Sequence, residues 1–146
     1  MLKNQLVFAA IAGVVTSAAV IGWTNHQTPA QSSSRTPYRA INVQQFVSQN
    51  RISGLNPNQT AVKLFADKEE AEGRQSESID IKYSRNNTAV IMLTKEGLAD
   101  DSVRALRQRI EMQRNQNGRW SVIWVGEQNK CQRGRGSQTW TAKLCS

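Results

Sequence analysis

The fold is decided by residues 106–125, which read Leu-Arg-Gln-Arg-Ile-Glu-Met-Gln-Arg-Asn-Gln-Asn-Gly-Arg-Trp-Ser-Val-Ile-Trp-Val. The pair Asn117-Gly118 is the strongest short-range indication of a β-hairpin, because a type I′ turn requires residues that tolerate positive φ angles. Such a turn needs a strand on each side. We therefore predict antiparallel strands at residues 106–115 and 119–125.

Two further strands are predicted before this hairpin. Residues 78–83 alternate apolar and polar side chains, and residues 88–94 are apolar on both faces, which is typical of a central strand. A helix over residues 101–114 is the alternative to the strand at 106–115, because the apolar residues of this segment also fit helical spacing. The Asn-Gly turn favours the strand, so the prediction is a sheet of four antiparallel strands.

One helix is predicted to cover this sheet, beginning after Asn56. Asn56 precedes a proline, and Gln59 follows three residues later, which is the pattern of a helix cap. Gly73 is expected to end the helix, and a helical turn is also expected within residues 43–55. The apolar stripe is Ala61, Val62, Leu64 and Phe65. The predicted fold class is α+β, with a helix packed on a four-stranded antiparallel sheet.

The start of the chain indicates export. Residues 6–23 carry no charge and follow Lys3; this length is at the lower limit for a membrane-spanning helix and exceeds the usual core of a signal peptide. We interpret residues 1–23 as an uncleaved signal anchor in the membrane, with a cleaved signal peptide as the alternative. Residues 24–41 are predicted to be a flexible polar linker. Residues 42–146 then form one domain that faces the periplasm or another extracytoplasmic or lumenal space.

The only cysteines are Cys131 and Cys145. An isolated pair in an exported chain indicates one disulfide, with free thiols as the alternative. A structural zinc site would need four ligands, and the only histidine, His26, lies far away in the linker. We therefore predict a structural disulfide that closes a C-terminal loop of about fifteen residues and contributes about 3 kcal/mol. No metal site and no cofactor is predicted.

Charge is unevenly distributed along the chain, whose formal net charge is +8. Residues 102–146 carry nine Lys and Arg against two Glu, and such a basic segment attracts polyanions. An anionic lipid, an envelope polymer or an acidic protein fits the predicted location, whereas nucleic acid does not; a solvated charged face is the alternative. We expect the disulfide to hold Arg133 and Arg135 in one fixed array with Arg119. The predicted contact residues are Arg107, Arg109, Arg119, Arg133 and Arg135.

Trp120 and Trp124 are predicted to lie on the same side of their strand. We interpret the pair as part of the hydrophobic core, and a platform for binding a ligand is the alternative. The disulfide should also hold the C-terminal segment against this strand, with Trp140 covering the closed loop.

Several short motifs in the second half of the chain combine Trp, Gly, Asp and Cys. They are Asp100-Asp101-Ser102-Val103, Gly118-Arg119-Trp120, Trp124-Val125-Gly126, Cys131, Gly134-Arg135-Gly136, Trp140 and Cys145. Over residues 79–145 this set resembles a group of small exported proteins of cyanobacteria, for which no activity is implied and from which no site residue can be transferred. The layout is also similar, by analogy of architecture alone, to nuclear-transport-factor-like or cystatin-like folds, and a fold does not define a function.

Two functions from different classes are compatible with these features. The first is a non-enzymatic, membrane-tethered accessory or interaction domain whose basic half contacts an anionic surface or a protein partner. The alternative is a small hydrolase or lyase with its site in the concavity of the sheet. The domain has no histidine, and its candidate acids, Asp80, Asp100, Asp101 and Glu111, have no evident pairing. The interaction domain is therefore the preferred hypothesis, and its oligomeric state is left open.

Overall fold

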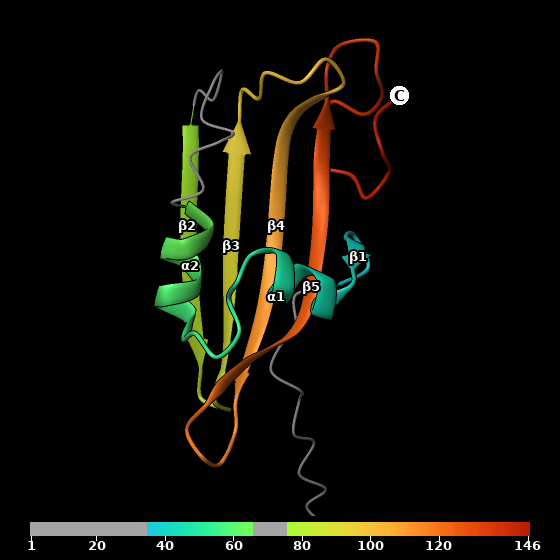
Figure 1. The fold of residues 1–146 in the computed structure, drawn as a ribbon. Helices are drawn as coiled ribbons and strands as arrows, with labels where there is room; N and C mark the ends of the chain where they lie inside the picture. Colours follow the sequence, from blue (N-terminus) through green and yellow to red (C-terminus); the bar gives the residue numbers. More distant parts are fainter. Residues whose placement is uncertain (1–34, 66–75) are drawn as a thin grey trace, which may run out of the picture. The chain divides into compact units, whose positions relative to one another are not determined.

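The computed structural model describes residues 35–65 and 76–146. They form an α+β domain with two short helices and a five-stranded antiparallel sheet of order β1-β5-β4-β3-β2 (Figure 1). The predicted anchor at 1–23, the linker up to residue 34 and the helix end at Gly73 lie outside the described residues. Within those residues, no helix is long and apolar enough to cross a membrane. The elements are β1 (Arg39–Ile41), α1 (Val43–Gln49), α2 (Pro57–Phe65), β2 (Ser76–Ser84), β3 (Thr88–Glu96), β4 (Val103–Arg114) and β5 (Trp120–Cys131).

The sheet has one strand more than predicted. β1 lies within the segment that we assigned to the linker, and it pairs antiparallel with β5, with Ile41 opposite Val125. A strand of three residues is too short to produce a recognisable alternation, so only its pairing with a distant strand reveals it. The helical turn predicted within residues 43–55 is confirmed as α1. It is capped by the side chain of Asn42, which accepts a hydrogen bond from the Gln45 backbone N–H at 2.9 Å.

The predicted hairpin is confirmed, and the alternative helix over residues 101–114 is wrong. β4 and β5 pair antiparallel up to Arg114 opposite Trp120, and the turn that joins them contains Gly118 at a φ of 78°. The expected type I′ turn is wrong, because Asn117 does not have a positive φ and the Gly118 N–H donates to the Asn115 carbonyl at 3.0 Å. The predicted cap of α2 is confirmed as well. The Asn56 side chain accepts from the Gln59 N–H at 2.9 Å, and the Gln59 side chain accepts from the Asn56 N–H at 3.0 Å.

Gly118→Val is expected to lower the free energy of unfolding by about 1–3 kcal/mol, the usual cost of holding a side chain in a sparsely populated backbone region. A Cβ at this position would also lie 3.3 Å from an Nη of Arg114. Urea denaturation of the two proteins measures the difference. Gln116→Val, in the same exposed turn, is the control and should change stability by less than about 0.5 kcal/mol. Equal effects at the two positions would contradict the assigned turn.

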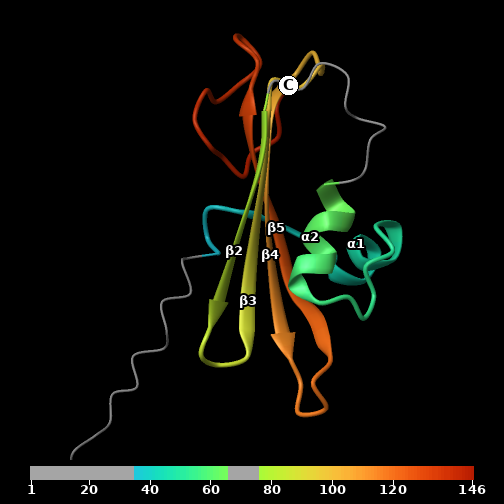
Figure 2. The ribbon, with the colours of Figure 1, turned by 90° about the vertical axis from the view of Figure 1, so that its left-hand side faces the viewer.

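The hydrophobic core lies between the sheet and the two helices, which occupy the same face of the sheet (Figure 2). We call this side the helix face. Ile91, Ile110 and Val125 supply fully buried side chains from the three central strands, and Phe46 and Leu64 reach them from the helices. The strands therefore alternate between this core and an opposite face that bears no helix among the described residues.

A β-bulge in β5 changes which side chains reach each face. Glu111 pairs with Trp124 but Met112 pairs with Val122, so Ile123 is an extra residue in β5. Trp120 and Val125 both pack on the core, although strict alternation would place them on different faces. Trp124 is consequently on the opposite face, and the prediction that it shares a face with Trp120 is wrong. An inserted residue reverses the alternation beyond it, and the sequence pattern does not reveal the insertion.

Candidate functional site

The candidate site lies on the opposite face and at the end of the sheet where the C-terminal segment folds back. Ile110 and Met112 of β4 point into the core. Side chains alternate along a strand, so Arg109, which precedes Ile110, and Glu111, which follows it, point to the opposite face. Residues 35–38 and the C-terminal segment both run along the side away from the helices (Figure 2). The two ends of the domain thus supply side chains to a face that the central strands have made polar.

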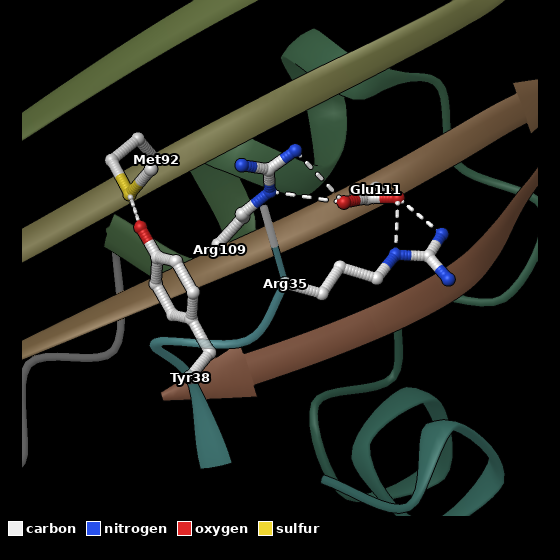
Figure 3. A network of polar contacts seen from close by, with 5 residues as sticks. All are labelled: Arg35, Tyr38, Met92, Arg109 and Glu111. Carbon is white, nitrogen blue, oxygen red and sulfur yellow. Dashed lines mark hydrogen bonds and ion pairs between the residues drawn. The ribbon is translucent and has the colours of Figure 1, made fainter. Parts of the chain in front are cut away.

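Three charged residues form an ionic cluster on this face, Arg35, Glu111 and Arg109 (Figure 3). Arg109 donates to one oxygen of the Glu111 carboxylate from Nε at 3.0 Å and from Nη2 at 2.9 Å. Arg35 donates to the other oxygen from Nε at 3.1 Å and also from Nη2. This hydrogen bond with Glu111 raises the pKa of Arg35. The side chains of Arg109 and Glu111 are 3% and 9% exposed, whereas that of Arg35 is 47% exposed.

Two aromatic rings close the face around the ionic cluster. Tyr38 packs edge-on against Trp124 with ring centroids 5.9 Å apart, and the Arg35 guanidinium lies 5.1 Å from the Trp124 ring centre. Gly126 makes this packing possible, since a Cβ there would lie 2.3 Å from the Trp124 ring and 2.8 Å from the Tyr38 Cβ. The Tyr38 hydroxyl contacts the Met92 sulfur at 3.8 Å. The arrangement is a packed, internally satisfied structure, and it leaves Arg109 without access to an external partner.

A third ring, Trp140, anchors the C-terminal segment to the sheet. The Arg107 guanidinium lies 4.1 Å from its ring centre and the Lys130 ammonium 4.5 Å from it, distances at which a cation is attracted to the face of an indole. Lys130 also pairs with Glu96 at 3.1 Å. Trp140 therefore lies against cations of β4 and β5, whereas we had expected it over the closed loop.

The predicted disulfide is present in the structure. Cys131 and Cys145 are bonded with Cα atoms 5.5 Å apart, and they close what we call the disulfide loop, residues 131–145. Asn129 and Thr141 exchange two backbone hydrogen bonds of 2.8 and 3.0 Å, so the loop runs antiparallel to the end of β5 as predicted. Gly136 passes so close to the disulfide that a Cβ there would lie 2.9 Å from the Cys131 sulfur.

The backbone of the disulfide loop is held by side-chain hydrogen bonds as well as by the disulfide. The Gln138 amide donates to the carbonyls of Cys131, Gln132 and Gly136 at 3.1–3.3 Å. Arg135 donates its backbone N–H to Gln132 at 3.0 Å and accepts at its carbonyl from Ser146 at 2.9 Å. The loop is therefore a fixed support for the side chains that it carries.

The structure separates the predicted contact residues. Arg133 and Arg135 are exposed on the disulfide loop, but Arg119 precedes the first residue of β5, about 36 Å away along a twelve-residue strand. The predicted single array is therefore wrong. Arg107 lies beneath Trp140, and Arg109 is buried in the ionic cluster.

Two other cations of the basic segment, Arg104 and Lys143, join Arg133 and Arg135 at this end of the sheet, although neither is among the five predicted contact residues. Arg104 contacts the disulfide loop through the Gln138 carbonyl at 3.5 Å, and Lys143 lies on the loop itself. Nothing in their local sequence distinguished them, because only the disulfide and the β4–β5 pairing place them together. We call the exposed set Arg104, Arg133, Arg135 and Lys143 the loop-end cations.

The carboxylates near this end are already engaged. The Asp100 carboxylate accepts from the backbone N–H groups of Val103 and Ser102 at 2.6 and 2.8 Å, which lower its pKa. Glu127 accepts from Gln108 at 2.8 Å and from Arg39 at 2.6 Å. These two carboxylates line a cavity of about 450 Å³. Asp100 stays ionised and is thus poorly suited to donate a proton, which gives the enzyme alternative no support here.

No group of three or more His, Cys, Asp or Glu side chains in the described ranges could hold a metal ion. The chain matches no family model, and neither a curated protein nor a solved structure matches it. The resemblance to exported cyanobacterial proteins therefore stays an expectation from the motifs.

Proposed function

We propose that this protein is a membrane-tethered, extracytoplasmic interaction domain without enzymatic activity, which binds an anionic surface through its loop-end cations. Support comes first from the charge of residues 102–146, where nine Lys and Arg accompany only two Glu. Both glutamates are engaged internally, Glu111 by Arg35 and Arg109 and Glu127 by Arg39. The exposed cations of this half therefore face solvent with little compensation from its own acids.

The observation that carries the proposal is the rigid support of the loop-end cations. The disulfide and the Gln138 amide hold the backbone of Arg133 and Arg135, so binding need not order a flexible tail. Asp100 and Asp101 lie on the neighbouring turn, and the Asp100 carbonyl accepts a hydrogen bond from Gln132 of the loop. Four loop-end cations outnumber these two acids, which leaves the end of the sheet basic.

An anionic lipid surface is the preferred target because residues 6–23 would keep the domain beside a membrane. A tether raises the effective concentration of the surface, so a contact that is weak in solution becomes significant. Each Lys or Arg close to an anionic membrane contributes about 1 kcal/mol. Four such residues are sufficient for a reversible, salt-sensitive contact.

Residues 32–146 form a compact unit with their own core, and this unit is suited to a binding test without the tether. It should bind vesicles of mixed anionic and neutral lipid at low salt, bind neutral vesicles weakly, and lose affinity as ionic strength rises. Arg133→Gln with Arg135→Gln should weaken binding about 30-fold, since two contacts of about 1 kcal/mol are lost. Vesicle co-sedimentation measures each affinity.

Arg85→Gln with Arg119→Gln is the matched control. It removes the same charge from exposed turn residues at the other end of the sheet, so it should change the affinity by less than about threefold. Equal effects of the two double variants would show that net charge alone drives binding and would overturn the site. Failure to bind anionic vesicles at low salt would overturn the lipid target and favour an acidic protein partner.

A further inference from the structure

The outer edge of β2 is open within the part of the chain that the structure describes. β2 is the last strand of the sheet, and its nine residues pair with β3 in an unbroken register from Ser76 opposite Glu96 to Ser84 opposite Thr88. The edge of β5, by contrast, is paired in part, with β1 over residues 125–127 and with Thr141 at Asn129. A regular edge strand without a proline or a bulge presents a row of N–H and C=O groups that can pair with another strand.

Apolar side chains continue along this edge on the helix face, where α2 lies beside β2 (Figure 1 shows the two elements). Ile79 and Ile81 of β2 and Ala61, Val62 and Phe65 of α2 line an apolar groove of about 520 Å³. Val62 and Phe65 are 67% and 50% exposed. Exposed apolar surface beside an open strand edge is typical of an interface.

We propose that a second copy of this chain pairs antiparallel with β2, around a twofold axis at Ile81. In this register Ile81 lies opposite its own counterpart, and Asp80 of each copy lies opposite Lys82 of the other. Ile79 lies opposite Tyr83, which adds an aliphatic–aromatic pair on the helix face. The twofold axis is perpendicular to the sheet, so the two apolar grooves meet on one side of a continuous ten-stranded sheet.

Charge complementarity selects this register. Asp80 and Lys82 are 3.3 Å apart within one strand, and both are well exposed, so they can exchange partners across the seam. Moving the axis to Asp80 would place Asp80 opposite itself, and like charges directly opposite are unfavourable. β2 also carries Glu77 and Asp80 against the single cation Lys82, so the seam lies away from the basic surface that would repel a second copy. This inference is independent of the proposed function.

The test is sedimentation equilibrium of the full chain in a mild detergent. The wild-type chain should show a monomer–dimer equilibrium. Asp80→Lys and Lys82→Asp should each raise the dissociation constant about tenfold or more, because two Asp–Lys pairs become two like-charge pairs. The double variant Asp80→Lys with Lys82→Asp restores the pairs in the opposite sense and should return the constant to within about threefold of wild type. Asp101→Lys, the same charge change away from the seam, is the control.

The rescue by the double variant distinguishes this seam from association through any other part of the chain. A monomeric wild-type chain at all accessible concentrations would overturn the proposal and leave the edge to a strand of a different protein. A dimer that neither single variant weakens would place the interface elsewhere. Single variants that weaken the dimer without rescue by the double variant would overturn the register.

Discussion

Glu111→Ala is expected to lower the free energy of unfolding by about 3–5 kcal/mol, the usual cost of removing one partner from a buried ion pair. The Arg109 side chain is only 3% exposed and donates two hydrogen bonds to Glu111, so the variant removes the carboxylate that balances the charge of a buried guanidinium. Arg35 would lose its carboxylate partner at the same time and keep its contact with the Trp124 ring. Urea denaturation of residues 32–146 measures the loss.

Two further variants test this explanation. Arg35→Ala should cost about 1 kcal/mol or less, because Arg35 is half exposed and its remaining partner stays paired with Arg109. Replacing the buried pair together, by Arg109→Met with Glu111→Leu, should recover most of the stability lost in Glu111→Ala, since an apolar pair leaves no unpaired charge. A double variant as unstable as Glu111→Ala would contradict the role given to the buried charge.

Cys131→Ser with Cys145→Ser is expected to lower the free energy of unfolding by about 3 kcal/mol and the melting temperature by about 10–20 °C. The bond joins residues fourteen positions apart, and without it the unfolded chain regains the freedom of that loop. The native loop should also loosen, which would release Trp140 from Arg107 and Lys130. Hydrogen exchange of residues 132–146 and scanning calorimetry measure these effects.

The control for this prediction separates the bond from the change of side chain. Cys131 is 1% exposed, so a buried serine hydroxyl could itself be costly. Cys131→Ala with Cys145→Ala avoids that hydroxyl, and reduction of the wild-type chain avoids any substitution. All three should give similar losses, and unchanged melting after reduction would contradict a stabilising disulfide. If the loop-end cations bind anionic lipid, the loosened loop should also bind anionic vesicles more weakly.

Features that depend on neighbouring residues were predictable from the sequence. The hairpin of β4 and β5 follows from the Asn117-Gly118 turn, since few residues other than glycine tolerate its backbone angles. The start of α2 follows from a cap whose two hydrogen bonds span only Asn56 to Gln59. The disulfide follows from the presence of only two cysteines. The turn and the helix cap join residues that are close in the sequence, and each cysteine has only one other cysteine with which it can pair.

Features that depend on distant residues required the tertiary structure. β1 is defined only by its pairing with β5, and the bulge at Ile123 appears only from the change in register against β4. Arg35 and Glu111 are 76 positions apart, so no spacing rule connects them. The sequence by itself determined the α+β class, the central hairpin and the disulfide. Only the tertiary structure decided which arginines are buried and which are exposed, because that depends on strand register and on which chain end covers each face.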